Sequence, residues 1–351
     1  MTKKIRIGFT RDFFNKDGNY IMPGLGPKVF DDMPDIEWQM LPEYLAEISP
    51  EQVVGLDMIM TWYPRWTRRS FESSEQLVSI HRVGVGYDKI DLSAATDAGV
   101  MLCITPQSCT RPMALTVLTY LLALSMRIRI MDKITREGRW QERTNYYGVG
   151  LTGKTLGLIG VGSIGHEVFK LALPLEMRHI AYDPYLSASA LADVKAELVD
   201  LDTVLAESDF LSINCPLTAE TKGMIGEREL RMMKKTAFLI NAARGPTINE
   251  KALIRALDEG WIKGAGLDVF EQEPVSSENP LLEMDNVIVS PHFLCHTDEH
   301  FINMAYEWKE QVEAIFRGEI PHKLVNREVW DTPKLQAKCN RLRTKVGNPN
   351  T

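Results

Sequence analysis

The sequence feature that most constrains the fold is a glycine-rich turn that follows a short apolar segment. Residues 155–159 read Thr-Leu-Gly-Leu-Ile, and Gly160, Gly162 and Gly165 follow with the spacing G-x-G-x-x-G. In a strand–turn–helix unit the first glycine permits the tight turn, the second lets a pyrophosphate approach the backbone, and the third lets the helix pack closely on the strand. The pattern therefore predicts a βαβ unit that binds a dinucleotide at a helix N-terminus.

An acidic residue supports this prediction. Asp183 ends the next apolar run, which begins at Arg178. It lies about 18 residues beyond the last glycine, close to the distance expected for a carboxylate that binds the adenosine ribose. A glycine-rich turn of a flavodoxin-like domain would explain the glycines but not the acid. We therefore expect NAD as the cofactor, and we expect Asp183 to disfavour a 2′-phosphate.

The composition narrows the classes of protein. A chain of 351 residues can form two domains, and a net charge of −7 argues against non-specific binding to nucleic acid. The longest apolar run, residues 112–126, is too short to span a bilayer, and the N-terminus lacks the apolar core of a signal peptide. The five cysteines form no C-x-x-C pair, which favours reduced thiols. We expect a cytoplasmic protein with no membrane or nucleic-acid partner and no metal site.

Apolar runs alternate with amphipathic stretches in two series. The first predicts strands at residues 5–9, 36–41, 58–62, 79–85 and 100–104. The second predicts strands at residues 155–159, 179–183, 210–214, 237–241, 265–269 and 287–290. Such alternation is typical of parallel sheets covered on both faces. We expect an α/β fold with two doubly wound, Rossmann-like domains and the active site in the cleft between them.

Helical segments complete this picture. Residues 110–137 predict a long helix with Pro112 in its first turn and a break near Met126, and this helix would connect the two sheets. Residues 299–316 predict a helix that ends at Gly318. Residues 338–351 are basic and lack periodicity, so we expect a mobile tail there.

Three polar residues follow neighbouring strands of the second series. Arg244, Glu273 and His292 come after the predicted strands 237–241, 265–269 and 287–290. Ligands of open parallel sheets lie outside the carboxyl ends of the strands. A guanidinium can bind a carboxylate and polarise the adjacent oxygen, and a histidine exchanges protons near neutral pH. The three residue types therefore fit redox chemistry at a 2-hydroxy acid.

The chain resembles the D-2-hydroxyacid dehydrogenase family, which includes glycerate, phosphoglycerate and D-lactate dehydrogenases, over about residues 80–330. The motifs that carry the resemblance stand in family order: Arg-Val-Gly-Val-Gly-Tyr-Asp-Lys-Ile-Asp at 82–91, Leu-Thr-Gly-Lys-Thr-Leu-Gly-Leu-Ile-Gly at 151–160, Asn-Ala-Ala-Arg-Gly at 241–245, Gly-Leu-Asp-Val-Phe-Glu-Gln-Glu-Pro at 266–274 and Ser-Pro-His at 290–292.

The resemblance implies a role for each matching residue. Arg244 would bind the substrate carboxylate and keto oxygen, with His292 as the acid/base and Glu273 as its partner. The amides of Val85 and Gly86 would receive the substrate carboxylate. The cofactor would be held by Gly160, Gly162, Ser163, Ile164, Gly165, Asp183, Cys215, Pro216, Ala242, His292 and Asp268, the last through the nicotinamide carboxamide.

The resemblance also implies the domain organisation and the assembly. Residues 1–105 with 300–337 would form a flavodoxin-like substrate-binding domain, and residues 106–299 the NAD-binding Rossmann domain. The substrate would be a small 2-hydroxy or 2-keto acid. The protein would be a homodimer that associates through its NAD-binding domains.

Several alternatives stay open at this stage. Glu271 competes with Glu273, and His296 competes with His292. Gly245 would free the backbone beside Arg244 for a ligand. Cys295 is either a small core or pocket residue or a nucleophile, and we favour the first. The remaining candidates belong either to a binding site or to ordinary packing and solvated surface: Trp62, Tyr63 and Trp66 for the substrate mouth, and Arg65, Arg68, Arg69 and Arg111 for a second acidic group of the substrate.

Two other functions also fit part of the pattern. A formate- or phosphite-type dehydrogenase belongs to the same superfamily, but formate-type enzymes typically place glutamine where Glu273 stands. An NAD(H)-sensing interaction protein related to transcriptional corepressors would keep the same motifs. Turnover of keto acids with NADH separates the enzyme from the sensor. The sequence identifies neither the 2-hydroxy acid nor the physiological direction of the reaction.

Overall fold

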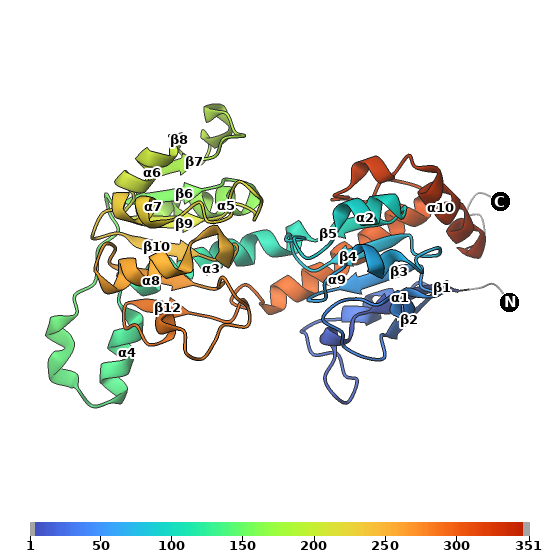
Figure 1. Cartoon of the computed structure of the whole chain (residues 1–351), viewed down its shortest axis with the longest axis horizontal. Helices are drawn as coiled ribbons and strands as arrows, with labels where there is room; N and C mark the ends of the chain where they lie inside the picture. The colour runs from blue at the N-terminus through green and yellow to red at the C-terminus, as the bar shows by residue number, and fades with distance from the viewer. Residues whose placement is uncertain (1–3, 347–351) are drawn as a thin grey trace. The chain divides into compact units, whose positions relative to one another are not determined.

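The computed structural model describes residues 4–346. The chain divides into two compact units, which Figure 1 shows with their helices and strands labelled. Unit 1 combines Met1–Cys109 with His296–Thr351, and unit 2 is Thr110–Cys295. Each unit contains one parallel sheet, as the two alternating series predict.

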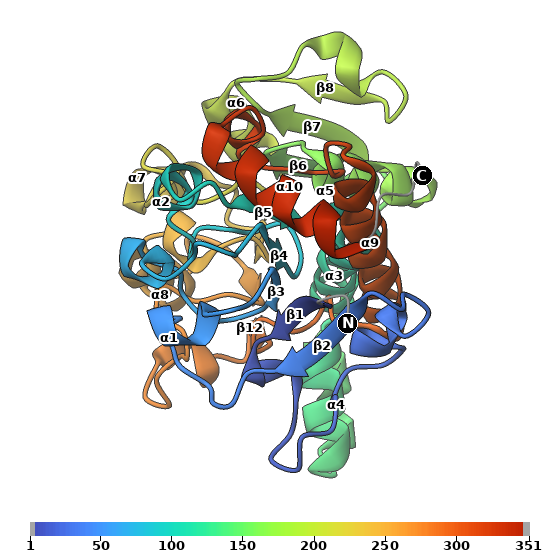
Figure 2. The ribbon, with the colours of Figure 1, turned by 90° about the vertical axis from the view of Figure 1, so that its right-hand side faces the viewer.

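Unit 1 contains a five-stranded sheet with the order β2-β1-β3-β4-β5, in which every pairing is parallel. Its strands are β1 (Ile5–Phe9), β2 (Ile36–Met40), β3 (Met58–Thr61), β4 (Ser79–Arg82) and β5 (Met101–Ile104). The helices are α1 (Pro50–Val53), α2 (Leu92–Asp97), α9 (Asp298–Arg317) and α10 (Pro333–Val346). In Figure 2, α1 and α2 lie on one side of this sheet and α9 on the other.

Alternating side chains of the unit 1 strands supply two separate cores. Met58 and Met60 pack with Phe301 and Trp308 of α9, whereas Ile59 packs in the cluster that contains residues of α1 and α2. This alternation follows from the two-residue period of a strand. Because both faces are covered, the strands are apolar on both sides, as the sequence predicts.

Unit 2 contains a seven-stranded parallel sheet with the order β12-β11-β10-β9-β6-β7-β8. Its strands are β6 (Thr155–Ile159), β7 (Arg178–Tyr182), β8 (Ala196–Leu198), β9 (Phe210–Ile213), β10 (Phe238–Asn241), β11 (Gly264–Leu267) and β12 (Val287–Val289). The helices are α5 (Ser163–Ala172), α6 (Leu201–Glu207), α7 (Glu227–Met232) and α8 (Glu250–Asp258), together with most of α3 and with α4. The strand order reverses between β6 and β9, which is where doubly wound sheets bind their ligands.

All the predicted strands are present, but the sequence analysis missed one. Six strands were expected in the second series, and the structure adds β8, which pairs with β7 at the edge of the sheet. This strand contains only three residues, Ala196–Leu198, of which none is fully buried. A short edge strand has no continuous apolar run, so hydrophobic periodicity does not detect it.

The long connecting helix differs from its prediction in its start. Helix α3 spans Pro106–Ser125, so Pro112 lies inside it and not in its first turn. The prediction was wrong because Pro106, four residues before the expected start, already occupies the first helical position. The expected break is present: α4 spans Ile128–Arg136 at 59° to α3, and Arg127 between them is left-handed with φ of 56°.

Helices α3 and α4 are the apolar helices of this region. Within residues 4–346, no single helix has the length and apolar composition needed to cross a bilayer, although α3 and α4 taken together pass by length and composition. Much of α3 belongs to the core of unit 2, including the buried residues Val117, Tyr120 and Leu121.

The C-terminal segment is not the tail that its composition predicts. Residues 338–346 belong to α10, and residues 347–351 lie outside the described part. Leu335, Cys339 and Leu342 form a buried stripe of this helix in the core of unit 1. The ammonium of Lys338 is also buried and donates to the carbonyls of Leu77 at 2.9 Å and Ala98 at 2.8 Å. These three residues stand at helical spacing, but the basic residues between them conceal the apolar stripe in the sequence.

Candidate active site

The glycine-rich turn has the geometry that a phosphate cradle requires. Gly160 has φ of +87°, and a Cβ there would lie 2.8 Å from the amide nitrogen of Cys215. A Cβ at Gly165 would lie 2.6 Å from the carbonyl oxygen of Gly160. At Gly162, in contrast, a Cβ would meet no described atom within 4 Å. The first and third glycines are therefore required by packing, and the second leaves open space beside the N-terminus of α5, where Ser163 and Ile164 begin the helix.

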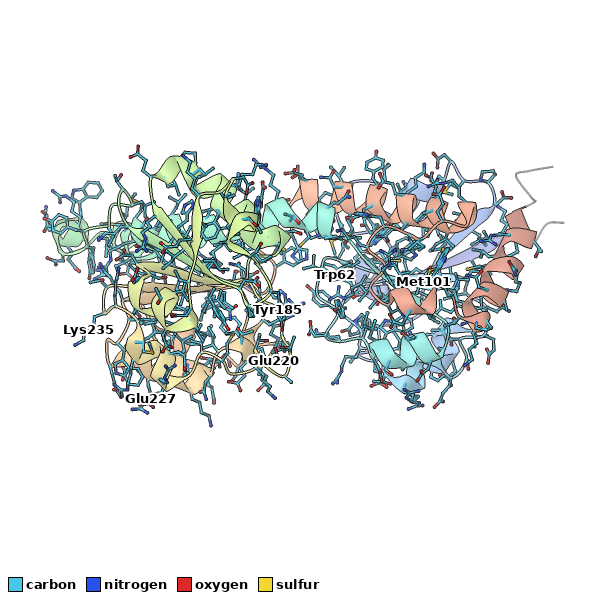
Figure 3. The ribbon with its side chains drawn as sticks, turned by 90° about the horizontal axis from the view of Figure 1, so that it is seen from above. Trp62, Met101, Tyr185, Glu220, Glu227 and Lys235 are labelled. Atoms are coloured by element: carbon cyan, nitrogen blue, oxygen red, sulfur yellow. The ribbon has the colours of Figure 1, made fainter. Side chains whose placement is uncertain are left out.

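Asp183 stands directly after β7 and fixes the glycine-rich turn. Its Oδ2 accepts a hydrogen bond from the amide of Val161 at 2.9 Å, and its Oδ1 accepts one from the amide of Tyr185 at 3.0 Å. The exposed Tyr185 donates its hydroxyl to Glu220 at 3.2 Å, and Figure 3 shows both residues in unit 2. Carboxylate oxygens accept more than one hydrogen bond, so Asp183 retains capacity for ribose hydroxyls.

Cys215 and its neighbours close the other side of the turn. Cys215 and Pro216 follow β9, and Ala242 follows β10, so both segments lie at the carboxyl edge of the sheet. Burial raises the pKa of the Cys215 thiol to about 11, which keeps it neutral. Its Sγ lies 3.8 Å from Sδ of Met224. A neutral, buried thiol serves as a small packing group and not as a nucleophile.

Arg244 follows β10 and is held by its own segment. Its Nη1 donates to the carbonyl of Ala243 at 2.7 Å, and its carbonyl accepts from Nδ2 of Asn241 at 3.0 Å. The sequence suggested that the next residue, Gly245, leaves the backbone open to a ligand. The structure gives this glycine a different reason, which is close packing. A Cβ at Gly245 would lie 1.9 Å from the carbonyl carbon of Phe270, so this glycine allows two backbone segments to touch.

Glu273 and His292, which were predicted as an acid/base pair, are joined by a hydrogen bond. Oε2 of Glu273 lies 2.9 Å from Nδ1 of His292, while its Oε1 accepts from the amide of Phe270 at 3.2 Å. Both side chains are about one-third exposed, at 31% and 33%. Because Glu273 occupies Nδ1, Nε2 of His292 is the nitrogen that can exchange a proton with a ligand.

Asp268 is buried below this pair and anchors the loop that carries His292. Its Oδ1 accepts from the hydroxyl of Ser290 and from the amides of Phe293 at 3.1 Å and Leu294 at 3.4 Å. Burial raises the pKa of Asp268, and the hydrogen bonds from Ser290 and the positive charge of His292 oppose that rise. The site lies on β10, β11 and β12, which are consecutive neighbours in the sheet.

Unit 1 contains the loop predicted to receive a carboxylate. Val85 and Gly86 are partly exposed and follow β4. The preceding Gly84 has φ of +73°, and its amide donates to Oγ1 of Thr105 at 2.8 Å. The left-handed conformation turns the chain sharply at a position where glycine carries no steric cost.

The rival residues have other contacts. Oε2 of Glu271 accepts from the amide of Glu250 at 3.2 Å, so it caps α8. The ring of His296 stacks on that of His300, with centroids 5.2 Å apart. Trp66 is buried and donates to Thr61 at 3.2 Å, as expected of a packing residue.

The four arginines differ in their surroundings. Arg68 pairs with Asp97 at 2.9 Å, and Arg111 pairs with Glu167 at 2.8 Å. Arg65 and Arg69 are exposed. Ion pairs between exposed side chains contribute little to stability. The surroundings of the four arginines are those of a solvated surface.

Sequence reasoning missed two residues of this site. Ser290 was quoted only as part of the Ser-Pro-His motif, and Tyr120 was treated as one apolar position of a long helix. In the structure the hydroxyl of Tyr120 lies 2.5 Å from Oγ of Ser290. No local signal identifies such a pair, because the two residues are 170 positions apart.

The fold and the glycine-rich cradle define an NAD-binding oxidoreductase, and comparison with known proteins gives the family. The sequence model described as D-isomer specific 2-hydroxyacid dehydrogenase, NAD binding domain, matches residues 118–293. The chain belongs to this family and is an NAD-dependent 2-hydroxyacid dehydrogenase.

The alignments with several named relatives cover most of the length of each relative. The chain is 42% identical over 262 residues to a glyoxylate reductase of Korarchaeum cryptofilum, covering 74% of this chain and 79% of the relative. It is 38% identical over 316 residues to a glyoxylate reductase of Thermococcus litoralis, covering 88% and 95%. The solved structure of D-lactate dehydrogenase from Aquifex aeolicus, with NAD and lactic acid, matches with a TM-score of 0.78 at 26% identity, covering 89% of this chain and 96% of that one.

Proposed function

We propose that this enzyme reduces a small 2-keto acid to the 2-hydroxy acid, with His292, Glu273 and Arg244 as its catalytic residues. The hydrogen bond of 2.9 Å between Nδ1 of His292 and Glu273 carries the proposal. The pair leaves Nε2 of His292 able to donate a proton, and the carboxylate holds the imidazole in one orientation as its charge changes.

Each residue has a separate task in this reaction. When bound, NADH supplies the hydride that is added to C2 of the keto acid. Nε2–H of His292 gives its proton to the C2 oxygen, so the carbonyl becomes a hydroxyl. Arg244 binds the carboxylate and polarises that oxygen through its planar guanidinium. In the reverse direction neutral His292 accepts the hydroxyl proton.

We propose binding residues in both units. Unit 1 would bind the substrate through the amides of Val85 and Gly86, which follow the left-handed Gly84. In unit 2, Asp268 would accept from the nicotinamide carboxamide with the oxygen that does not hold the His292 loop. The proposed substrate-binding domain is residues 1–105 with 300–337, to which the rest of α10 is added because it packs in unit 1, and the proposed NAD-binding domain is residues 106–299.

Glyoxylate is the first substrate to test, because several relatives are named glyoxylate reductases. A panel of glyoxylate, hydroxypyruvate, pyruvate and larger 2-keto acids, followed by NADH absorbance, would give kcat/KM for each. Turnover of at least one, abolished in His292→Asn, supports the proposal. NADH binding without turnover of any keto acid would contradict it and favour a sensor.

We also propose that the protein is a homodimer through unit 2. Leu115 and Leu122 lie two helical turns apart on α3 and are both 41% exposed, and Met126, directly after α3, is 51% exposed. Trp140 and Tyr147 beyond α4 are 60% and 76% exposed. Exposed large apolar side chains of this kind are typical of an interface. A second copy of the chain is the fitting partner, since a two-fold axis would pair the face with itself.

The mass of the protein in solution tests this assembly. Leu122→Glu would place a charge in the interface and should shift the mass from dimer to monomer in light scattering. Val54→Glu is the matched control, because Val54 is 60% exposed but belongs to unit 1. A wild-type monomer, or equal dissociation of both variants, would overturn the proposed interface. The five cysteines are buried and form no C-x-x-C pair, which supports a reducing, cytoplasmic location.

A further inference from the structure

A buried chain of hydrogen bonds connects α3 to the loop that carries His292. The hydroxyl of Tyr120 lies 2.5 Å from Oγ of Ser290, and the hydroxyl of Ser290 donates to Oδ1 of Asp268. Tyr120 and Asp268 are both 1% exposed. All of these residues belong to unit 2.

The ring of Tyr120 is fixed in place by close packing on Gly266 of β11, which has no side chain. A Cβ at Gly266 would lie 2.6 Å from Cδ1 and 2.7 Å from Cγ of Tyr120. The ring therefore packs on the bare backbone of the strand that leads into Asp268. Such close packing holds the hydroxyl at one point and limits the rotation that would break its hydrogen bond.

The direction of the chain follows from the chemistry of its groups. A carboxylate only accepts, so Ser290 must donate to Asp268, and the oxygen of Ser290 is left to accept from Tyr120. Burial raises the pKa of Tyr120, which keeps its hydroxyl protonated and able to donate. Hydrogen bonds arranged in one direction polarise and strengthen one another.

The hydrogen-bond chain ends at the backbone that follows His292. Oδ1 of Asp268 also accepts from the amides of Phe293 at 3.1 Å and Leu294 at 3.4 Å. His292 itself has φ of +54°, a left-handed conformation that is uncommon for residues other than glycine. Such a conformation persists where surrounding contacts hold it, and the amides bound to Asp268 are contacts of that kind.

We infer that Tyr120 and Ser290 are positioning residues that hold Asp268 against the amides of Phe293 and Leu294 and thereby fix the orientation of His292. The inference rests on the proposed role of His292. Tyr120 touches neither substrate nor cofactor in this account. It acts through two intervening side chains on the residue that exchanges the proton.

Hydrogen exchange tests the inference without any turnover. In Tyr120→Phe the ring is kept and only the hydroxyl is lost, so we expect the amides of Phe293 and Leu294 to exchange about fivefold faster, as one weakened hydrogen bond allows. Tyr20→Phe is the control, because Tyr20 is a largely buried tyrosine of unit 1 whose hydroxyl has no hydrogen-bond partner among residues 4–346. Ser290→Ala breaks the same chain at its centre and should reproduce the effect.

Kinetic measurements then test whether the hydrogen-bond chain affects catalysis. Tyr120→Phe should lower kcat for keto-acid reduction about fivefold and leave the Kd for NADH unchanged, whereas Tyr20→Phe should leave both unchanged. Wild-type exchange rates at Phe293 and Leu294 in both Tyr120→Phe and Ser290→Ala would overturn the inference, whatever the activity. Full turnover in His292→Asn would instead overturn the proposed function, and the exchange result would still decide whether the chain holds the loop.

Discussion

The carboxylate of Glu273 lies 2.9 Å from Nδ1 of His292, and the same carboxylate accepts from the amide of Phe270 at 3.2 Å. Glu273 is thus tied to its own loop by one oxygen and orients the imidazole with the other. The backbone amide fixes the carboxylate, and the carboxylate fixes the ring. This arrangement makes the pair sensitive to the loss of charge at Glu273 even when the shape is retained.

Glu273→Gln should therefore lower kcat for keto-acid reduction by roughly 10- to 100-fold, within the range for a misplaced or weakened general acid. The amide keeps the volume of the carboxylate but removes the charge that stabilises imidazolium. Stopped-flow reduction with NADH would measure the step directly. Glu271→Gln is the matched control, because Glu271 contacts the amide of Glu250 and not His292. If the two variants behave alike, the pairing is wrong.

Arg244→Ala should lower kcat/KM for the keto acid about 100-fold or more while the Kd for NADH stays near that of the wild type. In the proposed mechanism the guanidinium would bind a group that becomes more negative during hydride transfer, and the loss of one such donor has costs of this size. Fluorescence titration with NADH and steady-state kinetics separate the two effects. Arg136→Ala, which removes an exposed arginine paired with Asp132, should change neither quantity.

Asp183 should give a preference for NADH over NADPH of roughly 30-fold, the result of about 2 kcal/mol of charge repulsion against a 2′-phosphate. The following residues, Pro184 and Tyr185, supply no cation. Asp183→Asn is informative because an amide oxygen can still accept from Val161, which keeps the glycine-rich turn in place. We expect this variant to lose most of the discrimination. An unchanged ratio of kcat/KM values would remove Asp183 from cofactor selection.

The sequence predicted local structure correctly where a pattern has one structural meaning. The turn at Gly160–Gly165 requires a strand before it and a helix after it, and the structure contains both. Glu273 and His292, which follow β11 and β12, came together because neighbouring parallel strands place their carboxyl ends at one edge. Here topology converts a linear order of motifs into a cluster.

The sequence failed where an interaction depends on distant contacts. Tyr120 resembles any apolar residue of α3, and its hydroxyl acquires a partner only when β11 presents a glycine beneath the ring. Gly245 suggested access for a ligand, but its missing side chain accommodates Phe270. The basic segment after Lys338 suggested solvent exposure, yet carbonyl groups of unit 1 accept from it. Tertiary partners decided each case.

Lys338 gives a prediction about the stability of unit 1. The residue is 7% exposed, and its ammonium donates to the carbonyls of Leu77 and Ala98. Burial lowers its pKa from 10.5 to about 8. Between these two pKa values the unfolded chain binds a proton at this side chain and the folded chain does not. The free energy of unfolding contributed by Lys338 must therefore rise with pH across this window, by up to about 3 kcal/mol.

Urea unfolding of the wild type and Lys338→Met at pH 8 and pH 10 would measure this effect. Methionine has a similar shape and no titratable group, so the wild type should gain stability relative to the variant as the pH increases. Lys334→Met is the control, because Lys334 lies one turn earlier in α10 and is exposed, and its difference from the wild type should hardly depend on pH. A stability difference between the wild type and Lys338→Met that stays constant between pH 8 and 10 would show that the ammonium is as easily protonated in the folded chain as in water, and would contradict the prediction.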